Sequence, residues 1–189
     1  MYWVWVSEQT ADDEAMIYGP TDFSEEEDLE FDSGLIADDE ATLVDITRDE
    51  HSQGVMADNV NLLGSGGLMF SSKLRQVLTG ILLNIQYFPV VVKNLVDGSQ
   101  TSDYNVANIV GRVSCLDREN SVLQISPEDE DVIEFIEVLA IDEASANSFD
   151  LFRLHEEPEI ILASTRVKEA CESNRITGVR FYEPCDYEF

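Results

Sequence analysis

Eight stretches of the chain are rich in β-branched and aromatic residues, the composition typical of β-strands. In the stretch at 132–139, Glu134 and Glu137 interrupt the apolar residues and are expected to face water. Pro89 cannot donate to a strand ladder, so its strand is expected at an edge or a bulge. The eight predicted strands span residues 2–6, 43–46, 85–92, 104–110, 132–139, 149–154, 160–163 and 179–182.

The first predicted helix begins near residue 72. Ser71 or Ser72 can cap its N-terminus, because a serine hydroxyl accepts a hydrogen bond from a backbone N–H of the first turn. Gly80 is expected to end it, since glycine tolerates the left-handed conformation just past a helix end. Its apolar face, at i, i+3, i+4 spacing, consists of Leu74, Val77 and Leu78.

A second helix is predicted near the C-terminal end of the sequence. Ser164 or Thr165 caps its N-terminus, and Gly178 follows its end. The residues expected on its apolar face are Val167, Ala170 and Cys171.

These elements predict an α+β fold, strand-rich, with a mixed and mostly antiparallel sheet and a few short helices, because strands outnumber helices and no regular strand–helix alternation is present. The glycine-rich run Gly64–Gly67 marks the expected boundary between an acidic N-terminal region, residues 1–63, and an α+β domain, residues 64–189. At 189 residues the two are expected to form one compact unit. No internal repeat is evident in the sequence.

Charge changes the functional picture more than any motif does. The chain has 39 acidic and 11 basic residues, a formal net charge of −28. Direct binding to nucleic acid or to an anionic membrane is disfavoured, since such contacts are built from Lys and Arg. A basic protein is the expected partner, because complementary potentials speed encounter and reject wrong partners. A surface that serves only solubility, or adaptation to high salt, is the alternative.

The acidity is concentrated near the N-terminus. Residues 1–60 hold eighteen acidic residues and one basic residue, Arg48. Apolar residues are interleaved with the carboxylates of the run at 22–32, which favours an ordered, partner-binding surface over a solvated loop. The predicted partner-binding residues are Asp22, Phe23, Glu25, Glu26, Glu27, Asp28, Glu30, Phe31, Asp32, Asp38, Asp39 and Glu40.

The expected location is the cytoplasm. Residues 1–6 are apolar but lack the basic flank of a secretory signal. The longest apolar stretch, residues 81–92, is too short to span a bilayer. The three cysteines, Cys115, Cys171 and Cys185, form no CxxC pair. They are expected to be reduced thiols, two of them buried as small apolar residues.

No catalytic, metal or cofactor site is predicted. The two histidines, His51 and His155, belong to no cluster with metal-ligand spacing. Lys73 stands at the wrong distance from Gly64–Gly67 for a phosphate-binding loop. The many carboxylates single out no acid–base pair, and neither Asp38–Ala41 nor Pro127–Asp131 has the spacing of a calcium-binding EF-hand loop.

Segments across residues 68–182 resemble a bacterial immunity-protein family that is encoded beside polymorphic toxins. Their order along the chain is more specific than any one of them. The segments that carry the resemblance are Ser72-Lys-Leu-Arg-Gln-Val-Leu78, Ile85-Gln-Tyr-Phe-Pro89, Tyr104-Asn-Val-Ala-Asn-Ile109, Asp150-Leu-Phe-Arg-Leu154, Ile160-Ile-Leu-Ala-Ser164, Val167-Lys-Glu-Ala170 and Ile176-Thr-Gly-Val-Arg-Phe181.

The resemblance implies a cytoplasmic antidote that binds a cognate toxin and blocks it, and not an enzyme. It supplies no catalytic residues; Phe152, Gly178 and Phe181 are expected to be architectural. Together with the charge, it points to a basic toxin such as a nuclease, with pore-forming and transferase toxins as alternatives. Two alternatives stay open: a hydrolase that reverses a toxin's modification, and an acidic adaptor or chaperone for some other basic protein.

Overall fold

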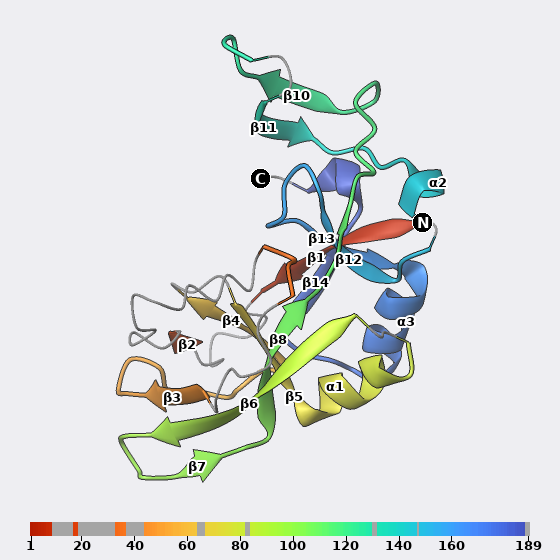
Figure 1. Ribbon diagram of the computed structural model, residues 1–189. Helices are drawn as coiled ribbons and strands as arrows, with labels where there is room; N and C mark the ends of the chain where they lie inside the picture. The colour runs from red at the N-terminus through yellow and green to blue at the C-terminus, as the bar shows by residue number, and fades with distance from the viewer. Residues whose placement is uncertain are drawn as a thin grey trace.

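A computed structural model describes residues 1–8, 17–18, 33–36, 44–63, 67–81, 84–129, 132–146 and 148–187. Within these residues the chain forms mixed sheets and three short helices, an α+β arrangement in which strands predominate (Figure 1). The coarse fold prediction is therefore confirmed.

The first sheet has five strands in the order β14-β1-β13-β12-β9. All neighbouring strands are antiparallel except β12 and β9, which are parallel. The strands are β1 (Tyr2–Ser7), β9 (Arg112–Val113), β12 (Leu151–Leu154), β13 (Ile161–Ser164) and β14 (Val179–Tyr182).

The second sheet has the order β2-β4-β5-β8-β6-β3, and β7 pairs with β6. The β2–β4 and β3–β6 pairs are parallel and the others are antiparallel. The strands are β2 (Ile17–Tyr18), β3 (Val44–Arg48), β4 (Asn59–Leu63), β5 (Gly67–Ser71), β6 (Ile85–Asn94), β7 (Gln100–Thr101) and β8 (Tyr104–Ile109).

A separate antiparallel pair, β10 (Val122–Ile125) and β11 (Ile133–Val138), extends from the body at one end (Figure 1). The short helix α2 (Glu143–Ala146) follows it, and a single 3-10 turn, η1 (Pro184–Asp186), follows β14. The strands predicted from sequence all have counterparts here. The sequence pattern missed β4, β5, β10 and the two-residue strands β2, β7 and β9.

The main helices, α1 (Ser72–Thr79) and α3 (Thr165–Ser173), begin where the sequence predicts. Ser71 accepts a hydrogen bond from the N–H of Leu74, and Ser164 accepts one from Val167. Gly80 ends α1, but with φ −79° and ψ −6°, so the predicted left-handed conformation is wrong.

Gly178 is not the residue that ends α3. Asn174 caps that helix, and Arg175 adopts the left-handed conformation with φ 52°. Gly178 has φ +78°, and a Cβ there would lie 2.7 Å from the Cβ of Ala57 and closer still to the carbonyl oxygen of Asn59. A glycine is therefore required at this position, just before β14, because the backbone of Asn59 lies too close for a side chain.

Pro89 lies where the partner of β6 changes. Residues Ile85–Pro89 pair with β8, whereas the pairing with β3 begins at Val90. Although β6 is an inner strand in the sheet order, Pro89 itself has a paired strand on one side only, which is where a residue without an N–H is tolerated.

The largest core lies where the two sheets meet the two main helices. It contains Trp5 from β1, Phe70 from β5 and Ile161 from β13, together with residues of α1 and α3. The rings of Trp5 and Phe181 are edge to face, with centroids 5.5 Å apart. Phe152 is fully buried in a neighbouring cluster and Phe181 is partly buried, as expected for architectural residues.

The two sheets repeat one topology. The series β9-β12-β13-β1-β14 in the first sheet corresponds to β2-β4-β5-β8-β6 in the second. In both series the first pair is parallel and the next three pairs are antiparallel, and a helix follows the third strand. The chain thus contains a first repeat, β1 to β6, and a second repeat, β8 to β14.

Side-chain contacts repeat as well. Asp58 precedes β4 and accepts from the hydroxyl of Ser71 at 2.7 Å, while its other oxygen pairs with Lys73 at 2.9 Å. At the equivalent positions Asp150 accepts from Ser164 at 2.6 Å and pairs with Arg166 at 3.3 Å.

The first strands of the two repeats also match, and each lies in the other repeat's sheet. Tyr104, the first residue of β8, donates its hydroxyl to the carbonyl of Ala57 at 3.1 Å. Tyr2, the first residue of β1, donates to the carbonyl of Phe149 at 2.9 Å. Because β8 pairs with β5 and β6 of the first repeat while β1 pairs with β13 and β14 of the second, the repeats have exchanged their first strands.

The predicted boundary at residues 63 and 64 falls between β4 and β5, which pair with each other. Strand β1, from the predicted N-terminal region, is an inner strand of the first sheet. The division into two regions stays a prediction.

Candidate partner-binding surface

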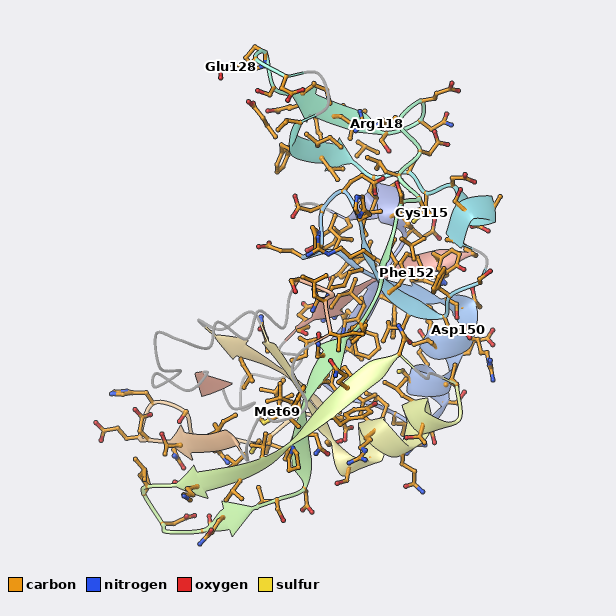
Figure 2. The ribbon with its side chains drawn as sticks, in the orientation of Figure 1. Met69, Cys115, Arg118, Glu128, Asp150 and Phe152 are labelled. Atoms are coloured by element: carbon orange, nitrogen blue, oxygen red, sulfur yellow. The ribbon has the colours of Figure 1, made fainter. Side chains whose placement is uncertain are left out.

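The β10–β11 pair forms an arm that carries apolar side chains into solvent. Residues Val122, Ile125, Val132 and Phe135 are each between 37% and 47% exposed. Glu128 lies at the outer end of the arm (Figure 2). The pairing of β10 with β11 contains two register shifts, so the arm is an irregular two-stranded ribbon, a structure that is marginally stable by itself.

Contacts at its base hold the arm in place. Ile136 and Leu139 are buried in a cluster that includes Cys115, which lies where the arm joins the body (Figure 2). An isolated antiparallel β-bridge between Leu116 and Ile141 joins the segments that lead into and out of the arm. The backbone N–H of Ala140 donates to the Ser121 hydroxyl at 2.9 Å. The base is thus part of the packed fold, whereas the outer half of the arm is open to solvent.

A groove of about 510 Å³ separates the arm from the five-stranded sheet. One wall is β11, and the other is formed by β1, β13 and the loop between β12 and β13. The residues that line it are Val4, Trp5, Glu134, Phe135, Ile136, Glu157, Glu159, Ile160, Ile161 and Tyr187.

The groove is negatively charged. Its three ionisable carboxylates come from both walls: Glu134 on the arm, Glu157 and Glu159 on the opposite loop. Burial, followed by repulsion from Glu159, raises the pKa of Glu157 above its ordinary value of 4.5. None of the described residues that line this groove is Lys, Arg or His. A cation placed between the walls would relieve the repulsion among the carboxylates.

A second hollow of about 370 Å³ continues from the groove and shares Trp5, Glu159, Ile161 and Tyr187 with it. Arg153 lines this second hollow but is only 2% exposed, and its guanidinium donates to the carbonyl of Pro158 at 2.7 Å. The buried guanidinium braces the β12–β13 loop from inside.

The partner-binding residues predicted from sequence, in the ranges 22–32 and 38–40, lie outside the described residues. The sequence pattern predicted the strand at 132–139 but not its pairing into the arm. Its signal was present in the alternation of Val122-Leu-Gln-Ile125, the Ser126-Pro-Glu-Asp129 turn, and a second strand after it. Because apolar alternation looks the same in a core strand and in an exposed one, the sequence could have revealed a hairpin but not its exposure.

The histidines and cysteines do not gather into a reaction centre among the described residues. His51 and His155 are both exposed and lie in separate loops. Cys115 and Cys171 are buried, as predicted, and burial raises the pKa of each thiol to about 12. Such thiols are inert at neutral pH.

One group of described residues, Glu183, Cys185 and Asp186, lies close enough together to hold a metal ion. All three are exposed, and exposed acidic groups of this kind are common in proteins that bind no metal. We assign no metal site to them.

The sequence was compared with models of known protein families. Residues 8–186 match the Immunity protein family (Imm11). The chain belongs to this family. The resemblance inferred from residues 68–182 is therefore confirmed, and the match extends over nearly the whole chain. No curated protein matches the chain.

Membership of Imm11 supports an immunity function and, with it, a partner toxin. No described helix of this Imm11 protein is both long and apolar enough to cross a membrane.

Proposed function

We propose that this protein neutralises a cognate bacterial toxin by binding it stoichiometrically, without catalysis. The observation that carries the proposal is the Imm11 match over residues 8–186. The buried thiols and the separated, exposed histidines are in keeping with a binding role, since neither arrangement activates a nucleophile.

The toxin is proposed to be basic, and a nuclease is the leading candidate. A net charge of −28 favours a positively charged partner and steers it during encounter. Carboxylates held in a row can occupy the groove in which a nuclease binds phosphates, because both are regularly spaced negative charges. Inhibition is proposed to take place in the cytoplasm, through protein contacts alone, with no binding to nucleic acid or membrane.

Co-expression with the toxin encoded by the neighbouring gene tests the proposal. We expect rescue of growth and a one-to-one complex in size-exclusion chromatography with light scattering. Protection by far less than one equivalent of this protein would favour the hydrolase alternative instead. A neighbouring gene that encodes a basic housekeeping protein, bound without any toxic activity, would favour the adaptor.

The acidic run at 22–32 is proposed to steer the toxin. Reversing three charges there, Glu25→Lys, Glu26→Lys and Glu27→Lys, should slow association by about tenfold at low salt and flatten its salt dependence. Stopped-flow association rates at several salt concentrations measure this.

A variant with the same charge change elsewhere is the control. Glu50, Asp103 and Glu169 are exposed, and their replacement by Lys also adds six units of charge. If both triple variants associate at the same rate, net charge alone governs encounter and the assignment of the run is wrong.

A further inference from the structure

The repeated topology separates a common framework from two inserts. The first insert, residues 19–57, lies between β2 and Asp58. The second insert, residues 114–149, lies at the same place in the second repeat, between β9 and Asp150, and contains the arm and α2. The described part of the first insert contains β3, whereas the second contains the arm and α2, so the framework does not dictate these elements.

Most of the charge belongs to the inserts. The first has thirteen acidic residues and one basic residue, and the second has ten acidic and one basic. Together they account for −21 of the net −28, which leaves −7 for the framework. The acidity is therefore not a general property of the surface, as solubility or adaptation to salt would require.

The second insert also has apolar side chains that are exposed to solvent, where they add little to the buried core. Val122, Ile125, Val132 and Phe135 lie in a ribbon that the buried residues Ile136 and Leu139 anchor to the described fold. Exposed apolar side chains that cluster within a rim of charge are typical of protein-binding sites. In this ribbon, residues 122–138, six residues are acidic and none is basic.

We propose that the toxin docks on the arm and in the groove beneath it, inserting a segment in which Lys or Arg residues flank an apolar side chain. This rests on the proposed function. Phe135, which lines the groove and is 40% exposed, would contact the apolar side chain of that segment. Glu134 and Glu159, on opposite walls, would pair with its cations.

Charge selects this occupant over the others that an apolar surface can bind. A second copy of the chain would bring a like-charged arm against the same carboxylates. Nucleic acid and anionic lipid would be repelled in the same way. A basic protein segment satisfies both the apolar and the anionic parts of the surface. The acidic run at 22–32 would then raise the rate of association with the toxin, and the arm would lower the rate of dissociation.

Affinity for the toxin domain encoded by the neighbouring gene tests the docking surface. The variant Glu134→Lys/Glu159→Lys should bind at least about tenfold more weakly, and Phe135→Ala should raise the dissociation rate by about tenfold or more. Surface-immobilised toxin and biolayer interferometry give both rates. Amides of residues 122–138 should also exchange hydrogen more slowly in the complex.

The matched control is Asp103→Lys/Glu169→Lys, which makes the same charge change at exposed sites outside both inserts and the groove. It should bind within about twofold of the wild type, since distant exposed charges contribute little to retention. Equal loss in both double variants, or no loss in the groove variant, overturns the docking surface while leaving the proposed function intact. Failure of the wild type to bind the toxin overturns the proposed function itself.

Circular dichroism and thermal unfolding establish that each variant is folded. Glu134 and Glu159 are exposed, so the double charge variant keeps the test valid even if Phe135→Ala disturbs the arm. Exchange in 122–138 that does not change on binding would also contradict the proposal.

Discussion

Gly178 has a backbone conformation with φ +78° and lies against the backbone of Asn59, so both its freedom and its lack of a side chain are used. Gly98 shares the positive φ, +73°, but has open space around it. Gly80 has neither constraint. The three glycines therefore have different backbone and packing requirements, which the sequence alone does not distinguish.

Replacing each of these glycines with alanine separates the two effects. Gly178→Ala should lower the free energy of unfolding by about 2–5 kcal/mol, because strain and steric overlap add. Gly98→Ala should cost about 1 kcal/mol from backbone strain alone. Gly80→Ala should change stability by about 0.5 kcal/mol or less. Urea denaturation measures all three. If the two variants lose the same free energy of unfolding, the backbone of Asn59 moves away from the added Cβ without a measurable loss of stability.

Other residues were predictable because their roles are local or generic. The two capping serines follow from the preference of helix N-termini for a hydroxyl. The burial of Cys115 and Cys171 follows from their behaviour as small apolar side chains. The exposure of Phe135 was not predictable, since nothing in its sequence neighbourhood distinguishes it from a core phenylalanine.

At the scale of elements, Asp58 ties three segments together. Its carboxylate accepts hydrogen bonds from Ser71 at the start of α1, from Lys73 at 2.9 Å, and from the backbone N–H of Thr177 at 3.1 Å ahead of β14. Burial raises the pKa of this carboxyl, but hydrogen bonds from these three residues outweigh burial, and the net pKa lies below its ordinary value of 3.8. The ionised form is therefore the one that the fold stabilises.

The variant Asp58→Asn should lower the free energy of unfolding by about 1–3 kcal/mol at pH 7. Because the folded pKa is depressed, the contribution of wild-type Asp58 is fully present above pH 3.8 and is lost as the pH falls through the lower folded pKa. The stability difference between variant and wild type should therefore shrink in that range. Urea midpoints from pH 7 to pH 3 measure it.

Glu169→Gln is the control, since Glu169 is exposed on α3. Its effect should be close to zero at every pH. The stability difference between Asp58→Asn and the wild type could instead stay constant down to pH 3. The shape of the Asp58 side chain, and not its charge, would then be what stabilises the fold.

At the scale of the whole molecule, the exchange of first strands makes each repeat depend on the other. Strand β1 is an inner strand between β13 and β14, and β8 is an inner strand between β5 and β6. Without the other repeat, each sheet would lose a central strand together with its share of the core around Trp5 and Phe70. Neither repeat has a complete sheet of its own.

Cutting the chain in the exposed turn after β6, between Leu95 and Val96, tests this dependence. Each fragment alone should lack cooperative unfolding, whereas the mixed fragments should form a one-to-one complex with the circular dichroism of the intact protein. Thermal melts and light scattering measure both. A fragment that folds alone as a monomer would contradict the exchange.

The two main helices, eight of the strands, the acidity and the family could be inferred from the sequence, because helix caps, strand composition and charge depend on neighbouring residues. Strands β4 and β5 and the two-residue strands could not, since their residues show no such local pattern. Strand pairing depends on long-range packing, since β1 pairs with β13 about 160 residues along the chain and the packing of the shared core selects that partner. The tertiary structure also decided which apolar strands face solvent. Alternation predicts a strand with an apolar face, but whether another element covers that face depends on the whole fold, and in the arm Val122, Ile125, Val132 and Phe135 stay 37% to 47% exposed.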